Sequence, residues 1–318
     1  MNIFHKLENL DDFSKKGVVA LGNFDGLHLG HQKVINTAMN IAKDQMVSLS
    51  VFTFEPHPQS VFSSSKETFR LSPLNIKTQL MRMMGVQTLF VQKFDNNFSK
   101  TSANDFISDF LVSGFEALHI VVGFDFVFGN KRLGNVELLR KMSGKFNFSV
   151  SVVNEYKTLM GFEISSTQIR DYLKQGKCAK ASELLGRNWE VVSKVEGGDK
   201  RGRELGYPTA NLPLNEYLHP CKGVYAVRIS LEYDNKVIKY NGIANFGLRP
   251  TFSKEDVLLE VHIFDFNKNI YDMELKVEFL KFIRPEKKFN NLDDLKSQLK
   301  KDCEIVKSIF SNDNLGIS

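Results

Sequence analysis

The sequence predicts an α/β protein with two domains: a parallel sheet with crossover helices, then an antiparallel β-barrel that ends in a helix. Three observations lead to this prediction. The chain has 318 residues, about the length of two domains. Strand-like and helical patterns alternate in the first half, whereas strand-like segments follow one another in the second. The pattern changes near Gly186, so we expect domains at residues 1–186 and 187–318.

In the first half, short runs of β-branched residues are each followed by a helical pattern. The expected strands are residues 18–21, 47–54, 88–92, 118–123 and 146–153. The expected helices are residues 32–43, 74–84, 103–111, 136–141 and 167–175, and the segment 177–185 closes this half. Strands joined by crossover helices form parallel sheets, which bind ligands beyond the carboxyl ends of their strands. Turns that directly follow strands are therefore candidate sites.

The second half consists mainly of strand-like segments with alternating apolar and polar residues. They are residues 191–195, 223–232, 236–244, 258–266 and 274–282. We expect them to form an antiparallel sheet closed into a barrel. A final helix is predicted by apolar residues that step by three and four: Leu292, Leu295, Leu299, Cys303, Val306 and Phe310.

Composition indicates an ordinary globular protein. Hydrophobic residues make up 42% and charged residues 25% of the chain, and 27 phenylalanines predict well-filled apolar cores. The net charge of +5 suits anionic small molecules, but it is too small and too scattered to indicate nucleic acid. No apolar run is long enough to span a bilayer, so no membrane partner is expected.

Cysteine usage and the first residues bear on location. Cys178, Cys221 and Cys303 are far apart and form no C-x-x-C pair, so neither a disulfide framework nor a zinc site is expected. The first residues lack a basic start followed by an apolar run, so no signal peptide is expected. We therefore expect a cytoplasmic protein, and no protein partner is evident from the sequence.

The most informative stretch is residues 22–32, GNFDGLHLGHQ, which lies between an expected strand and an expected helix. Its three glycines favour a tight turn or a close approach to a ligand. A glycine-rich turn before a helix start presents N–H groups and a positive helix end to phosphate. His28 and His31 are three residues apart, so both imidazoles can reach one anion.

Two simpler interpretations apply to these histidines. A pair at this spacing can bind a metal, but no third ligand is evident nearby, and an isolated histidine at a helix start is most often a cap. The glycines change that balance. The H-x-G-H pattern resembles the signature of nucleotidyltransferases that transfer AMP from ATP to a phosphate.

A second motif covers residues 164–170. Ser165 and Gln168 form a capping-box pattern, so these residues can simply be the start of a well-capped helix. Hydroxyls and an arginine at a helix start also suit a pyrophosphate; here they are Ser165, Ser166, Thr167 and Arg170.

Asp125 stands among aromatic residues after the strand 118–123. It is either a turn residue, or it contacts a base or ribose or helps to arrange metal and phosphate.

In the second half, residues 198–211 combine glycines with basic residues. Gly198, Lys200, Gly202 and Arg203 offer N–H groups and charge to a polyphosphate. Thr209 and Asn211 supply hard oxygen ligands suited to a magnesium–nucleotide complex. This is neither a Walker-type loop nor G-x-G-x-x-G, and alone it is weak evidence.

Glu260 is a carboxylate among apolar neighbours in the expected strand 258–266. It shares one strand face with His262, because successive side chains of a strand alternate between faces. Such a group can act as a general base, although a solvated glutamate on a strand is the more common case.

Together, these motifs closely resemble those of the prokaryotic bifunctional riboflavin kinase/FAD synthetase family over nearly the whole chain. Residues 22–32, 53–58 (TFEPHP), 122–134 and 164–170 resemble its FMN adenylyltransferase module, which implies a Rossmann-like nucleotidyltransferase domain. Residues 198–211, 223–225 (GVY), 242–251 (GIANFGLRPT) and Glu260 resemble its riboflavin kinase barrel. The order and joint presence of the motifs are more specific than any single one.

The resemblance implies a role for each matching residue. His28 and His31 would stabilise phosphates in the transition state of adenylyl transfer, and Glu260 would be the base of the kinase. Thr209 and Asn211 would hold Mg²⁺–ATP. Nucleotide contacts would come from Gly22, Asn23, Phe24, Gly30, Asp125, Ser165, Ser166, Thr167, Arg170, Gly198, Lys200, Gly202 and Arg203. One departure is Ser193, where the family leads us to expect a glycine; it would slightly reshape the kinase loop.

The implied function is bifunctional synthesis of flavin cofactors. ATP would phosphorylate riboflavin to FMN, and a second ATP would transfer its adenylyl group to FMN, giving FAD and pyrophosphate, with Mg²⁺ accompanying ATP. Two alternatives stay open: an enzyme with one active half, and a protein that binds flavin or nucleotide as a sensor. The joint presence of His28, His31 and Glu260 argues against the sensor, since binding alone does not need them.

Overall fold

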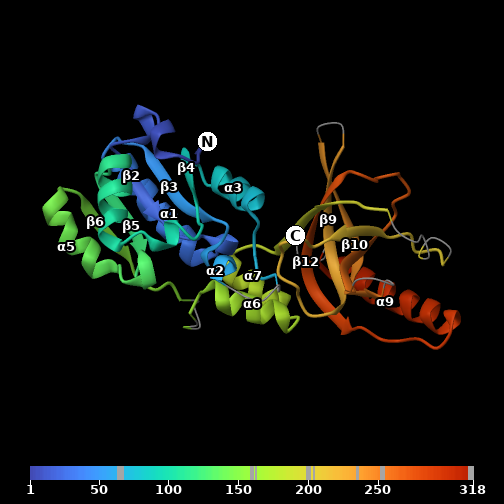
Figure 1. Ribbon diagram of the computed structural model, residues 1–318. Coiled ribbons are helices and arrows are strands. Elements are labelled where there is room, and N and C mark those ends of the chain that lie inside the picture. Colours follow the sequence, from blue (N-terminus) through green and yellow to red (C-terminus); the bar gives the residue numbers. More distant parts are fainter. Residues whose placement is uncertain are drawn as a thin grey trace. The chain divides into compact units, whose positions relative to one another are not determined.

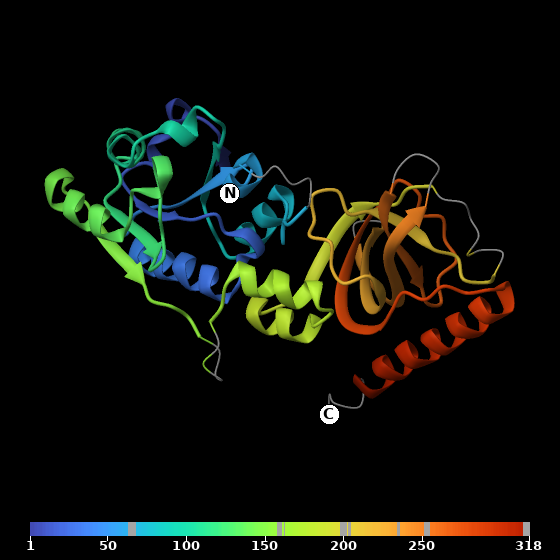
Figure 2. The same cartoon turned by 60° about the horizontal axis from the view of Figure 1, so that its bottom comes forward.

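The computed structural model describes residues 1–62, 68–157, 161, 163–197, 202, 205–233, 236–250 and 255–313. The chain forms two compact units (Figures 1 and 2). The first comprises Met1–Glu67 and Ser72–Ser166, and the second comprises Thr68–Leu71 and Thr167–Ser318. Each unit has its own sheet.

The first unit is built on a parallel sheet, as the sequence predicts. Its strands are β1 (Asn2–Phe4), β2 (Val18–Leu21), β3 (Leu49–Glu55), β4 (Thr88–Lys93), β5 (His119–Gly123) and β6 (Ser149–Val153). They are arranged in the order β1-β4-β3-β2-β5-β6, with parallel pairing throughout. The order reverses at β2, whose neighbours are β3 and β5. In open parallel sheets, ligands bind beyond the carboxyl ends of the strands at this point of reversal.

Helices cover both faces of this sheet (Figure 1). They are α1 (Leu29–Asp44), α2 (Pro58–Phe62), α3 (Leu74–Met83), α4 (Ala103–Asp105), the π-helix η5 (Phe106–Gly114) and α5 (Val136–Phe146). Apolar residues of α1 and α3 pack on one face with Val18 and Val51. On the other face, Phe52 and Phe90 pack with residues of η5 and α5.

The predicted helix 103–111 is present, but most of it is a π-helix rather than an α-helix. The predicted helix start at Gln32 is also corrected, since α1 begins at Leu29. Short elements without a periodic pattern were not predicted: β1, α2 and the 3₁₀ turns η1 (Leu7–Asn9), η2 (Asp12–Ser14), η3 (Asp25–Leu27), η4 (Phe98–Lys100) and η6 (Asn130–Arg132).

The second unit is an antiparallel, curled sheet, which confirms the predicted class of the second half. Its elements are α6 (Ser166–Lys174), α7 (Cys178–Leu185), β7 (Trp189–Lys194), β8 (Ala210–Pro213), β9 (Gly223–Tyr233), β10 (Lys236–Pro250), β11 (Glu255–Ile263), β12 (Glu274–Pro285) and α9 (Leu292–Asp313). The strand order is β7-β12-β9-β10-β11-β8. The sheet encloses large buried rings, among them Trp189, Tyr225 and Phe279.

Two hydrogen bonds join the outermost strands of this curled sheet. The Glu196 backbone N–H donates to Asn211 O at 2.9 Å, and the Ser193 hydroxyl donates to Pro213 O at 2.9 Å. Ser193 is buried, so the residue that departs from the expected glycine takes part in closing the barrel.

Helix α9 packs on the barrel through the residues that its periodicity selects. Cys303, Val306 and Phe310 are buried against Val224 and Phe264. Leu292, expected on the same apolar face, is instead 68% exposed because it lies in the first turn of the helix.

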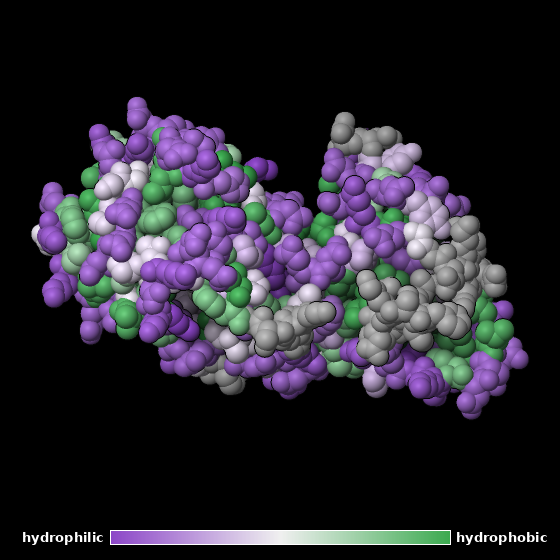
Figure 3. Space-filling model, in the orientation of Figure 1, coloured by the Kyte–Doolittle hydropathy of each residue, from purple (hydrophilic) through white to green (hydrophobic). Residues whose placement is uncertain are grey.

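Polar and apolar residues are interspersed over the surface in view (Figure 3). Such a mixed surface is normal for a globular protein. No helix among the described residues is long and apolar enough to cross a membrane.

The expected domain boundary at Gly186 marks the end of α7, whereas the compact units divide between Ser166 and Thr167. Helix α7 buries Cys178, Ala181, Leu184 and Leu185 within the second unit. In the same unit the Trp189 ring N–H donates to Leu71 O at 3.0 Å. The barrel therefore packs with segments that precede the expected boundary.

This packing predicts that α6 and α7 stabilise the second unit. A fragment covering residues 167–318 should unfold at a higher temperature than one covering 187–318. The shorter fragment loses the burial of two leucines, each contributing about 1.5–3 kcal/mol. Thermal unfolding followed by Trp189 fluorescence compares the two. Equal midpoints would show that α7 adds nothing to the barrel.

Candidate functional site

The loop after β2 makes a sharp turn that depends on unusual backbone angles. Phe24 has φ +52° and Gly26 has φ +77°, both in the left-handed region. The Phe24 ring folds back over Gly22, where an added Cβ would lie 2.9 Å from a ring atom. Glycine at position 22 is therefore required by close approach. The turn starts α1 directly at the carboxyl end of the central strand.

His28 and His31 lie face to face in this loop. Their ring centroids are 3.6 Å apart with an interplanar angle of 18°, and the Phe24 ring meets His31 edge-on at 5.4 Å. His28 is also the N-cap of α1, because its Nδ1 accepts from the His31 backbone N–H at 3.2 Å. The helix-cap interpretation is thus correct for His28. It is compatible with anion binding, since the cap places both rings at the positive end of the helix.

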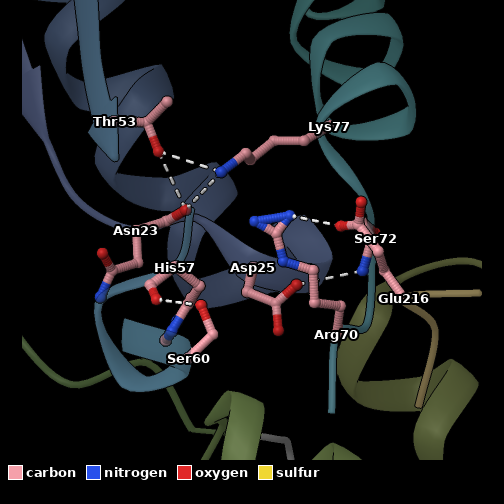
Figure 4. Close-up of polar contacts among 9 residues, drawn as sticks. All are labelled: Asn23, Asp25, Thr53, His57, Ser60, Arg70, Ser72, Lys77 and Glu216. Atoms are coloured by element: carbon pink, nitrogen blue, oxygen red, sulfur yellow. Dashed lines mark hydrogen bonds and ion pairs between the residues drawn. The ribbon is translucent and has the colours of Figure 1, made fainter. Parts of the chain in front are cut away.

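The carbonyl of Asn23 is held by two side chains from neighbouring elements (Figure 4). The Thr53 hydroxyl of β3 donates to it at 3.0 Å, and Lys77 Nζ of α3 donates to it at 3.1 Å. Lys77 is only 2% exposed. Sequence reasoning missed Lys77, although a lysine four residues before the buried Met81 shares its helix face.

The side chain of Asn23 carries a buried Oδ1 atom with no hydrogen-bond partner in the structure as described. A buried acceptor without a donor is costly, so an N–H or O–H group of a ligand at this atom would be favourable.

Ser166 connects the second motif with this loop, because its hydroxyl donates to Asp25 O at 2.9 Å. The carbonyl of Ile164 lies 3.7 Å from where a Cβ on Gly30 would stand. The 164–170 stretch therefore approaches residues 22–31, the histidine loop, through Ile164 and Ser166. Thr167 and Arg170 belong to the second unit, where Arg170 Nε donates to Phe69 O at 2.8 Å.

Asp125 lies beyond β5, the strand next to β2, and is exposed. Its Oδ1 lies 3.1 Å from a Cβ position built on Gly123. The carboxylate therefore turns back toward the strand end, at the sheet edge that also carries the histidine loop.

A cluster of phenylalanines lies at the carboxyl ends of β3 and β4. Phe94 contacts the rings of Phe54, Phe62 and Phe98 at 5.6–5.9 Å. Phe62 is 66% exposed. Sequence analysis assigned the phenylalanines to cores, and an exposed ring attached to such a cluster offers a flat apolar surface for stacking.

The second unit contains a cavity of about 410 Å³ between the barrel and α9. A row of polar residues crosses its wall, since Asn245 of β10 pairs with Glu260 of β11, and Glu260 pairs with Asn211 of β8. All three line the cavity. Leu259 and Val261 point to the buried side. The strand alternation predicted around Glu260 is confirmed up to Ile263, where β11 ends.

Thr209 and Asn211 line this cavity together with Gly202. Asn211 is 7% exposed, and its Oδ1 is buried without a hydrogen-bond partner in the structure as described. A Cβ on Gly202 would lie 2.4 Å from Tyr207 O and 3.4 Å from Thr209 Oγ1. Gly198, Lys200 and Arg203 lie outside the described residues.

An ion pair that sequence reasoning missed forms another wall of the cavity. Arg284 of β12 donates to both carboxylate oxygens of Asp302 of α9 at 2.7–3.0 Å. Asp302 is 1% exposed. Cys303 also lines the cavity, and burial raises the pKa of its thiol to about 11. The thiol is therefore protonated near neutral pH.

Comparison with known proteins matches both units. The FAD synthetase family matches residues 10–168, and the riboflavin kinase family matches residues 185–310. The bifunctional riboflavin kinase/FMN adenylyltransferase of Bacillus subtilis is 39% identical, covering 98% of each chain. The enzyme of the same description from Buchnera aphidicola is 37% identical, covering 98% of this chain and 99% of that protein.

The chain belongs to the bifunctional riboflavin kinase/FMN adenylyltransferase family. This confirms the resemblance drawn from the motifs. Among solved structures, one described as "Macrolide-efflux Protein from Streptococcus pneumoniae" has a TM-score of 0.83 and 32% identity, covering 96% of this chain and 98% of that one. The histidine loop lies in the segment that matches the FAD synthetase family. The Asn245–Glu260–Asn211 row lies in the segment that matches the riboflavin kinase family.

Proposed function

We propose that this chain phosphorylates riboflavin to FMN with ATP and then transfers the adenylyl group of a second ATP to FMN, giving FAD and pyrophosphate. One observation carries the proposal. Each matched segment holds its own cluster of polar groups suited to such a reaction: the stacked His28 and His31 at the start of α1, and the Asn211–Glu260 pair in the cavity. Phosphoryl transfer needs mainly positioning and charge neutralisation, which groups of these kinds can supply.

In the adenylyl transfer, a phosphate oxygen of FMN attacks the α-phosphorus of ATP. A new P–O bond forms as the bond from the α-phosphorus to the bridging oxygen breaks, and pyrophosphate leaves with the electron pair. Negative charge grows on the leaving group and on the α-phosphate oxygens. His28 and His31 would donate hydrogen bonds to these oxygens, and the N-terminus of α1 would add its positive field.

The nucleotide of this first reaction is assigned to residues of the histidine loop, of the loop after β5 and of the 164–170 motif. They are Gly22, Asn23, Phe24, Gly30, Asp125, Ser165, Ser166, Thr167 and Arg170. The partnerless Asn23 Oδ1 supports this assignment, because it needs a donor from a ligand. The phenylalanine cluster with the exposed Phe62 would stack on the flavin ring.

In the kinase reaction, Glu260 takes the proton from the terminal ribityl hydroxyl of riboflavin. The resulting oxygen attacks the γ-phosphorus of ATP, and ADP leaves. Glu260 lines the cavity between the buried Leu259 and Val261 and is paired in register with Asn245, which supports this role. Gly198, Lys200, Gly202 and Arg203 are assigned to the phosphates.

Thr209 and Asn211 would hold the Mg²⁺ that accompanies ATP. The donor set fits, because Mg²⁺ prefers oxygen ligands and the buried Asn211 Oδ1 has no other partner in the structure as described. When bound, the ion neutralises charge on the phosphates.

We further propose that residues 1–186 carry the adenylyltransferase and residues 187–318 the kinase, in a cytoplasmic enzyme. Its partners would be ATP, riboflavin, FMN and FAD, with no nucleic acid, membrane or protein partner.

The function is tested by incubating the full chain with riboflavin, ATP and Mg²⁺ and separating the flavins by chromatography. We expect FMN to appear first and FAD to follow. FMN without FAD, or FAD from supplied FMN but not from riboflavin, would leave one active half. Binding of flavin without any product would identify a sensor.

Replacing His31 by alanine should block FAD formation while FMN formation continues. Loss of one donor to a developing charge costs about 3 kcal/mol, on the order of a hundredfold in turnover. Rates are measured separately with riboflavin and with FMN as substrate. The exposed His5 provides a matched control, and His5→Ala should leave both rates unchanged. Normal FAD formation by His31→Ala would exclude the proposed role.

Replacing Glu260 by glutamine keeps the size of the side chain but removes the proton acceptor. A general base contributes roughly 10²–10⁴-fold, so phosphorylation of riboflavin should fall by that order. Supplied FMN should still be converted to FAD at nearly the normal rate, because that reaction uses the other site. Glu274→Gln, at an exposed position of β12, is the control. Riboflavin phosphorylation within a few-fold of normal would return Glu260 to a structural role.

A further inference from the structure

Lys77 is a buried charged residue of the first unit that has no role in the proposed chemistry. It is 2% exposed and lies on the inner face of α3, beside the buried Ile76 and Met81. Burial of an ammonium group is costly unless polar atoms surround it. Apolar packing alone therefore does not explain why the ammonium group of Lys77 is buried.

One of its contacts is on the histidine loop, and a second is on the neighbouring strand β3. Lys77 Nζ donates to Asn23 O at 3.1 Å and to Thr53 Oγ1 at 3.2 Å, while Thr53 Oγ1 itself donates to Asn23 O at 3.0 Å. Figure 4 shows the three groups as a closed triangle. Thr53 is completely buried, so water does not replace these bonds. One carbonyl oxygen thus receives two donors, one of them charged.

That carbonyl belongs to the peptide that sets the turn. The Asn23 carbonyl carbon is bonded to the nitrogen of Phe24, whose φ of +52° is unfavourable for a residue with a side chain. The Phe24 ring then lies edge-on to His31, and His31 stacks on His28. Lys77 is therefore linked to both histidines by consecutive contacts. It bonds to the Asn23–Phe24 peptide, the Phe24 ring contacts His31, and His31 stacks on His28.

We propose that Lys77 is a positioning residue for adenylyl transfer, which fixes the Asn23–Phe24 peptide and through it the orientation of His31 and His28. The proposal rests on the proposed function for its kinetic readout, but not for its structural one. Lys77 holds the backbone of the loop rather than the reacting atoms. Its loss changes turnover more than nucleotide binding, because the other nucleotide contacts stay in place.

The test compares Lys77→Met, Lys77→Arg and Arg82→Met in the full chain. Methionine removes the donors at similar length, arginine keeps them, and Arg82 is an exposed cation on the same helix. For conversion of FMN to FAD, Lys77→Met should lower kcat by about 10–100-fold with KM for ATP within about threefold. Lys77→Arg should recover most of the loss, and Arg82→Met should match the wild type. Phosphorylation of riboflavin should be unchanged in all three.

Hydrogen exchange of the backbone amides in residues 23–28 gives the readout that does not need activity. Exchange should be faster in Lys77→Met and in Thr53→Val, which removes the second donor to the same carbonyl, and normal in Arg82→Met. If Lys77→Met keeps normal kcat, or if exchange in residues 23–28 is unchanged in Lys77→Met and Thr53→Val, the proposal is wrong. If the wild-type chain forms no FAD, the proposed function fails, and the exchange result alone decides the role of Lys77.

Discussion

The site in the first unit depends on one constraint, the left-handed turn at Phe24 directly after the central strand. It brings the first turn of α1 to the carboxyl end of β2 and packs the Phe24 ring between Gly22 and His31. A left-handed conformation costs a residue with a Cβ roughly 1–2 kcal/mol. Such strain persists only where surrounding contacts determine the backbone. Here the donors on the Asn23 carbonyl and the hydroxyl of Ser166 on Asp25 O supply those contacts.

The second unit positions its polar groups by strand register instead of backbone strain. Asn245, Glu260 and Asn211 form one row because three neighbouring antiparallel strands pair in a fixed register. A slip of one residue would turn Glu260 away from the cavity and bring apolar Leu259 or Val261 into it. The buried partners of those two residues make that slip unfavourable, so the core that stabilises the barrel also fixes the row.

Local patterns were enough to predict most of this structure. Periodicity located the main strands and helices, although α5 and β10 continue beyond their predicted ends. A glycine-rich turn after a strand pointed to His28 and His31, a stretch of glycines and basic residues to Asn211, and a carboxylate in an apolar strand to Glu260. What was missed depends on contacts between distant segments. The inward placement of Lys77 is set by Thr53 and Asn23, more than twenty residues away, and lysines are usually exposed. The Arg284–Asp302 pair and the packing of α7 on the barrel likewise have no signal in a single segment. Helix α1 starts at Leu29 rather than at the predicted Gln32. The earlier start was missed because its N-cap is a histidine, which is less common at this position than serine or aspartate.

The two candidate sites are both assigned to phosphoryl chemistry, but their side chains are positioned in different ways. In the barrel the positioning comes from strand register, and in the first unit it comes from a hydrogen-bonded turn. In the barrel, substitutions of cavity-lining side chains would affect the candidate site directly. Substitutions of core residues on the opposite face of the sheet would affect it by lowering the stability of the barrel. In the parallel-sheet unit, the histidines depend on a strained peptide whose carbonyl is held from two other elements. The proposal for Lys77 therefore expects a change more than forty residues away along the chain, on the buried face of α3, to alter the orientation of the histidines. Under the proposed role of Lys77, loss of activity in the first unit would follow not only from changes at residues that contact substrate but also from changes to the hydrogen bonds that maintain the turn.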